Sequence, residues 1–139
     1  MRLGLKRFLR IGGIFSLGAA GYPLIEIAWR GRTHILMALA GGICIVAVYY
    51  IARLPRRVPI IVKSLIGALA ITAVELSIGL VANRLCGLNI WDYSTLPHNL
   101  FGQICLMYSW FWFLLCIPLV CACRLLCRAF DRADRADWL

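Results

Sequence analysis

Four apolar stretches, each about as long as a membrane-spanning helix, constrain the fold of this 139-residue chain more than any other feature. A helix needs roughly 20 consecutive apolar residues to cross the hydrocarbon core of a bilayer. A membrane β-barrel is excluded, because it needs many short alternating segments that close on themselves. The sequence therefore predicts an all-α polytopic membrane protein with four transmembrane helices in antiparallel hairpins. The expected helices cover residues 8–29, 35–53, 60–82 and 102–126.

Composition agrees with a membrane protein. The chain is 63% hydrophobic and 15% charged, whereas a soluble domain averages about 45–50% and about 25%. The same numbers exclude a disordered chain. The length permits one domain, so we expect residues 1–139 to form a single membrane domain. Outside the helices, the two longest segments are an outer loop, 83–101, and a charged tail, 127–139, which we expect to be a solvated, salt-bridged helical extension.

The basic residues flank the apolar stretches unevenly. Of the 15 Lys and Arg residues, all but Arg30, Arg32 and Arg84 fall on one side of the expected bilayer. Cytoplasmic segments carry such an excess of positive charge, so both termini are expected in the cytoplasm. The expected partners of this charge are anionic lipid headgroups. Nucleic-acid binding is not expected, because the charges flank membrane helices. The residues on the basic side are Arg2, Lys6, Arg7, Arg10, Arg53, Arg56, Arg57, Lys63, Arg124, Arg128, Arg132 and Arg135.

The basic start and the first apolar stretch also have the form of a signal peptide, which could be cut at Ala19-Ala20-Gly21. The apolar stretch continues beyond this point to Trp29. The apolar region of a signal peptide has only about 7–15 residues and ends before the cleavage site, so we expect a retained helix.

Two carboxylates fall inside the expected helices, at Glu26 and Glu75. A charge at the centre of a bilayer costs roughly 2.5–3.5 kcal/mol on insertion scales, so each needs a reason to be there. Arg30 follows Glu26 by four residues, and Asn83 shares a helix face with Glu75. We predict an interhelical cluster of Glu26, Arg30, Glu75 and Asn83, joined by Arg84. It either fastens the helices together or forms a site that binds or moves something.

The outer loop and its end supply six further candidate residues: Trp91, Asp92, Tyr93, Ser94, Asn99 and Gln103. Trp and Tyr suit the headgroup region, and Asn99, after a turn at Pro97, is expected to cap the fourth helix. In that interpretation the loop only anchors the protein at the interface. In the other, the loop folds over the glutamates and supplies Asp92, Asn99 and Gln103 to an outward-facing polar pocket.

We predict no metal site and no cofactor. Cys121, Cys123 and Cys127 cluster near the end of the fourth helix without a nearby His, so ordinary apolar packing is expected. Cys86 and Cys105 bracket the outer loop, and the sequence leaves open whether they form a disulfide. The chain also lacks the glycine-rich lysine motif that cradles nucleotide phosphates.

The pattern of the outer loop and its flanks resembles a bacterial family of small membrane proteins named as ABC-transporter permeases of type IV. The resemblance covers roughly residues 72–115, and the first half of the chain resembles the family more loosely through Gly21, Glu26 and Arg30-Gly31. It implies that the signature positions are those of Glu75 and of the loop. The residues that carry it are Glu75, Asn83, Gly87, Trp91-Asp92-Tyr93-Ser94, Pro97, Asn99 and Gly102.

The resemblance implies a transporter or permease component of the bacterial inner membrane, with an ATPase as a separate chain on the cytoplasmic side. Four helices are few for a transport path, so a homo-oligomer or a partner membrane protein is expected. The chain is not expected to be an enzyme. The main alternative is a non-catalytic membrane scaffold or assembly factor, and the least favoured is an enzyme acting on a lipid headgroup, with Glu75 or Asp92 as its base.

Overall fold

The computed structural model describes residues 2–136 and is almost entirely helical. Within these residues, four helices are long and apolar enough to cross a membrane, which confirms the predicted all-α architecture. A π-helical turn, η1, follows the third helix, and two very short strands pair in antiparallel fashion before the fourth. The elements are α1 (Arg2–Arg30), α2 (Ile35–Ala52), α3 (Ile60–Gly79), η1 (Leu80–Leu85), β1 (Asn99–Leu100), β2 (Ile104–Cys105) and α4 (Leu106–Ala136).

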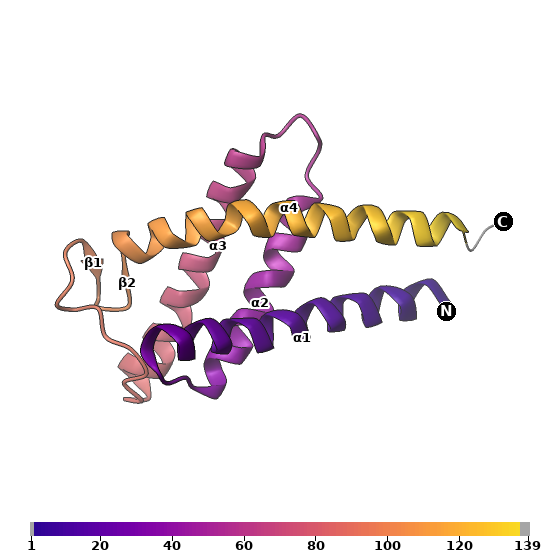
Figure 1. The fold of residues 1–139 in the computed structure, drawn as a ribbon. Coiled ribbons are helices and arrows are strands. Elements are labelled where there is room, and N and C mark those ends of the chain that lie inside the picture. Colours follow the sequence, from indigo (N-terminus) through magenta and orange to yellow (C-terminus); the bar gives the residue numbers. More distant parts are fainter. Residues whose placement is uncertain (1, 137–139) are drawn as a thin grey trace.

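The helices pack as two hairpins, α1 with α2 and α3 with α4, and α2 connects the two hairpins. α1 lies along α2, α3 lies along α4, and α2 also packs against both α3 and α4. The beginning of α1 and the end of α4 lie at the same end of the molecule, and the β1–β2 turn lies at the other (Figure 1). The side of the membrane on which each end lies stays a prediction from the charge pattern.

α1 and α2 approach each other closely because each has a glycine at the point where they cross. A Cβ atom added to Gly18 would collide with the carbonyl oxygen of Gly41, and one added to Gly41 would collide with that of Gly18. Small residues at helix crossings are a common way to gain packing in a bilayer, where no hydrophobic effect drives helices together.

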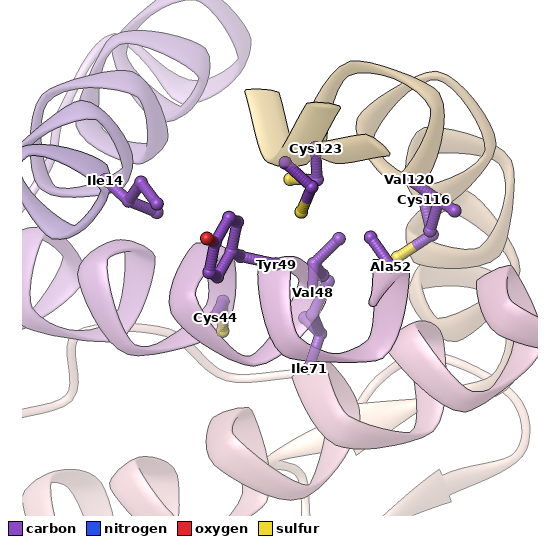
Figure 2. Packing of buried hydrophobic residues seen from close by; sticks show 10 residues of the cluster. Ile14, Cys44, Val48, Tyr49, Ala52, Ile71, Cys116, Val120 and Cys123 are labelled. Atoms are coloured by element: carbon purple, nitrogen blue, oxygen red, sulfur yellow. The ribbon is translucent and has the colours of Figure 1, made fainter. Parts of the chain in front are cut away.

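The core lies where α2 meets the other three helices. Val48 from α2 and Val120 and Cys116 from α4 are fully buried there, and Ile14 from α1 belongs to the same cluster, on the side of Tyr49 (Figure 2). Cys123 and Cys127 belong to the same apolar cluster, in agreement with the expected packing role. All seven cysteines are free thiols, including Cys86 and Cys105.

A buried lysine closes the end of α2. Lys63 is 1% exposed, and its Nζ donates hydrogen bonds to the carbonyl oxygens of Ala52, at 3.1 Å, and Leu54, at 2.6 Å. The last carbonyls of a helix have no partner within the helix and carry partial negative charge. The ammonium group satisfies the carbonyl of Ala52, the last residue of α2, and that of Leu54 just beyond it, so α2 and α3 are joined at this end.

Several boundaries differ from the sequence prediction. α4 begins at Leu106 rather than at residue 102, because residues 99–105 form the β1–β2 turn. Asn99 therefore does not cap this helix. α3 ends at Gly79 and η1 follows from Leu80, and α1 starts at Arg2, well before residue 8. The charged tail continues α4 to Ala136, where Asp134 pairs with Arg10, and residues 137–139 lie outside the described part.

We expect Lys63→Met to lower the free energy of unfolding by about 1–3 kcal/mol, because it leaves two carbonyl oxygens without their donor. The quantity can be measured by steric trapping or detergent-induced unfolding in bicelles. Arg56→Met, at an exposed residue of the same connection, is the matched control and should leave stability nearly unchanged. Equal stability of the two variants would contradict this role for Lys63.

Candidate functional site

Asn83 fixes the outer loop to the end of α3 through three hydrogen bonds. Its Nδ2 donates to the carbonyl oxygen of Trp91, at 3.0 Å, and to Oε1 of Gln103, at 2.9 Å. Its Oδ1 accepts a hydrogen bond of 2.7 Å from the backbone N–H of Ile90. The indole of Trp91 donates to the carbonyl oxygen of Gln103, at 2.9 Å. These residues, which we call the loop hub, are buried and satisfied by one another.

The local sequence explains why the hub forms here. Gly79 lets the loop lie directly against α3, since a Cβ at this position would be 2.5 Å from Oε1 of Gln103 and 3.0 Å from the ring of Trp91. η1 follows at once, and its wider turns change the angular spacing of the residues. Asn83 therefore faces the loop, and Arg84 is exposed on the same turn. The predicted cluster requires Asn83 and Arg84 to contact Glu26 or Glu75. Among the described residues neither bonds to either glutamate, so this part of the prediction is wrong.

Asp92, Ser94 and Asn99 shape the tip of the loop. Oδ1 of Asp92 accepts a hydrogen bond of 2.8 Å from the backbone N–H of Ser94, which lowers the pKa of this carboxyl group. Asn99 donates to the carbonyl oxygen of Leu96, at 2.8 Å, and accepts from the N–H of Gly102, at 3.1 Å. The three side chains act within the turn, and none of them lines the cavity described below.

Glu75 lies inside the bundle with both of its oxygens occupied. The side chain is 6% exposed. The hydroxyl of Tyr93 donates to Oε1 at 3.0 Å, and the indole N–H of Trp112 donates to Oε2 at 3.1 Å. Tyr93 comes from the loop and Trp112 from α4, so this carboxylate connects three parts of the chain. Both of its partners are neutral donors, and no cation of the described residues forms an ion pair with it.

Glu26 pairs with a cation on its own helix. Arg30, one turn further along α1, forms an ion pair and a hydrogen bond with Glu26. The other carboxylate oxygen accepts a hydrogen bond of 2.6 Å from the hydroxyl of Thr33. Arg30 also reaches the carbonyl oxygen of Ile90, at 3.4 Å, while its buried Nε has no hydrogen-bond partner among the described residues. The pair thus connects the end of α1 to the loop.

A cavity of about 260 Å³ lies between the Glu26–Arg30 pair and the partners of Glu75. Its walls hold two stacked ring pairs: Tyr93 with Tyr108, at 4.7 Å between centroids, and Tyr22 with Trp112, at 5.5 Å. We call it the aromatic chamber. Burial and the nearby Glu75 carboxylate raise the pKa of Tyr93, so its hydroxyl stays a donor at neutral pH. The lining residues are Tyr22, Ile25, Glu26, Trp29, Arg30, Tyr93, Tyr108, Phe111, Trp112 and Leu115.

The structure sorts the ten sequence candidates by place. Glu26, Arg30 and Tyr93 line the chamber, and Glu75 lies behind Tyr93 and Trp112. The other six belong to the loop hub or to the turn: Asn83, Trp91, Gln103, Asp92, Ser94 and Asn99.

Sequence reasoning missed most of the aromatic lining. Tyr22 gave a usable signal, because it precedes Glu26 by one helical turn. Trp29, Tyr108, Phe111 and Trp112 gave none, since an aromatic residue in a membrane helix can face lipid, a neighbouring helix or a cavity equally well.

A family model described as "Putative ABC-transporter type IV" matches residues 34–135. The chain belongs to this family. The match extends from α2 to α4 and includes Glu75, the loop hub, the turn and the α4 side of the chamber. α1, which carries Tyr22, Glu26 and Arg30, precedes the matched range. No curated protein and no solved structure matches the chain.

We expect Asn83→Ala to loosen the outer loop, because it leaves the Ile90 N–H and the Gln103 oxygen without their partner. Each buried group left unpaired costs about 1–3 kcal/mol. Hydrogen exchange of residues 88–103, measured in nanodiscs, should become at least about tenfold faster. Ser77→Ala is the control, since that exposed hydroxyl bonds only to its own helix. Unchanged exchange in Asn83→Ala would contradict the hub.

Proposed function

We propose that this chain is a membrane subunit of an ABC-type transport system in the bacterial inner membrane. Membership of the transporter family and four helices long enough to span the bilayer support this proposal. Both termini lie in the cytoplasm, as the distribution of Lys and Arg favours. The chain carries no nucleotide-binding motif, so the ATPase is a separate subunit that docks on the cytoplasmic side. The protein itself is not an enzyme.

The aromatic chamber is the substrate-facing cleft in this proposal. The observation that carries it is the chamber's combination of a charged pair, aromatic walls and an adjoining buried carboxylate on α3, a helix apolar and long enough to span a membrane. Binding sites for small molecules are mostly apolar and aromatic, with a few polar groups that orient the ligand. The chamber lies at the end of the bundle opposite the termini, which is the outer end when both termini are cytoplasmic.

Glu75 distinguishes this function from a purely structural one. A carboxylate that only fastened helices would be expected to pair with a cation, since an isolated charge in a bilayer is costly. Glu75 instead bonds to two neutral donors, and these donors themselves line the chamber. A ligand that displaces the ring of Tyr93 or Trp112 would meet this carboxylate directly. Four helices enclose only a small cleft, so a transport path requires a second copy or a partner membrane protein.

The alternative function is a scaffold or assembly factor. The loop hub and the turn favour it, because their polar groups bond to one another and leave little capacity for a ligand. In the transport function Glu75 takes part in contact with the ligand, whereas in the scaffold function it only connects the loop and α4 to α3.

Co-purification from native membranes in mild detergent tests the transport proposal. We expect an ABC-type ATPase to co-purify with the tagged chain, and its repeated absence would contradict the proposal. In the purified complex, Glu75→Gln should lower the rate of ATP hydrolysis about tenfold, which corresponds to about 1.4 kcal/mol. Membrane abundance should stay within twofold of the wild type. Ser77→Ala on the same helix should change neither. Lower abundance of Glu75→Gln without a separate loss of activity would favour the scaffold.

A further inference from the structure

A small cavity lies where the end of α2, the beginning of α3 and the second half of α4 meet. Its volume is about 180 Å³, and it shares no lining residue with the aromatic chamber. Five of its lining residues are basic and one is acidic, so we call it the arginine pocket. The charged residues of its wall are Arg53, Arg56, Lys63, Arg124, Arg128 and Asp131.

The acidic residue of the wall is already paired. Asp131 lies 3.9 Å from Arg53, whose guanidinium group also donates to the hydroxyl of Tyr49, at 3.1 Å. The other three arginines of the wall have neither an acidic partner nor a hydrogen-bond acceptor among the described residues. A guanidinium group stays charged at any physiological pH. Three positive charges in this pocket are therefore not offset by the described part of the protein.

Lys63 adds a positive charge on the buried side of the pocket. An ammonium group has three N–H donors, and Lys63 uses two of them on the carbonyl oxygens of Ala52 and Leu54. Arg124 lines the same pocket from α4, and no acidic side chain of the described residues pairs with either cation. Like charges repel strongly where the surroundings are only weakly polarisable. An anionic group in the pocket would offset this repulsion.

The length of α2 places the pocket at the edge of the hydrocarbon core. α2 is apolar enough to span a membrane and has 18 residues, so it is about 27 Å long. The hydrocarbon core is about 30 Å thick, and a helix of this length crosses it only when its two ends lie near the two edges. Ala52, the last residue of α2, lines the pocket. The pocket therefore lies at the depth of the lipid headgroups.

The surroundings of the pocket favour a lipid over a soluble anion. Apolar side chains next to the charged ones are exposed: Leu125, which follows Arg124, is 63% exposed, and Ile61, near Lys63, is 57% exposed. Acyl chains can lie against such residues while the headgroup enters the pocket. Guanidinium groups bind phosphate oxygens through several N–H donors at once. A phospholipid therefore satisfies both the charge and the apolar rim.

We propose that the arginine pocket binds the phosphate group of one anionic phospholipid. Arg56 from the α2–α3 connection and Arg124 and Arg128 from α4 donate to its oxygens, so the lipid connects the two hairpins at this end. The charge pattern of the sequence predicts only a diffuse attraction to anionic lipids. The pocket predicts one tightly bound lipid and identifies the arginines that bind it. The site uses no residue of the proposed substrate cleft and does not depend on the proposed function.

Native mass spectrometry of the full chain, titrated with phosphatidylglycerol or phosphatidylcholine, tests this proposal. We expect one phosphatidylglycerol per chain, bound about fivefold or more tightly than phosphatidylcholine, whose positively charged choline the arginines repel.

Two matched pairs of variants test the pocket itself. Arg56 and Arg57 are exposed neighbours in one connection, and Arg128 and Arg132 are exposed one turn apart on α4, but only Arg56 and Arg128 line the pocket. Arg56→Gln and Arg128→Gln should each weaken phosphatidylglycerol binding about fivefold, as expected for one basic residue near a phosphate. Arg57→Gln and Arg132→Gln should leave it unchanged. None of the four arginines bonds to another described residue, so each variant should fold.

Equal weakening within each pair would overturn the proposal, because a diffuse attraction makes no distinction between neighbouring arginines. Equal affinity for the two lipids would also overturn it. Glycerol 3-phosphate has the phosphate but no acyl chain, and its displacement of phosphatidylglycerol at equal concentration would assign the pocket to a soluble phosphate. Unchanged lipid binding by Arg56→Gln together with loss of a co-purifying protein would assign it to an acidic surface of that protein.

Discussion

The absence of water from the bilayer core is the constraint on which the whole structure depends. Every polar group at that depth needs a partner within the protein, because an unpaired one costs several kcal/mol. Lys63 satisfies the end of α2, and Asn83 satisfies the loop that returns to α3. These two buried side chains lie at opposite ends of the bundle. Between them, the packing of glycines, cysteines and aliphatic residues holds the helices together.

Glu75 connects this constraint to function. It bonds to Tyr93 from the loop and to Trp112 from α4, so the arrangement of the loop and the shape of the chamber depend on the same carboxylate. The family match includes Glu75 and both of its partners but begins after Glu26 and Arg30. Within the chamber, α1 thus contributes the charged pair, and the matched part of the chain contributes most of the aromatic wall.

The four helices could be predicted from the sequence because a span of apolar residues has one stable form in lipid, and the helix bounds of α2 came within a residue of the structure. The site could be predicted only in part. Glu26, Arg30 and Glu75 were evident because charge is costly in a bilayer. The roles of Asn83 and Asn99 were not, because the π turn and the β1–β2 turn change the direction of their side chains. Helix periodicity carries no signal for either turn.

The proposed function places the chamber and the outer loop on the outer side of the membrane, opposite the basic ends, and Cys86 tests this placement most directly. This thiol is exposed at the end of η1, beside the outer loop, whereas most of the other cysteines are buried. In spheroplasts, a membrane-impermeant maleimide should label the wild-type chain without lysis, and Cys86→Ser should abolish this labelling. Labelling of Cys86 only after the cells are lysed would put the loop and the chamber on the cytoplasmic side and contradict the account.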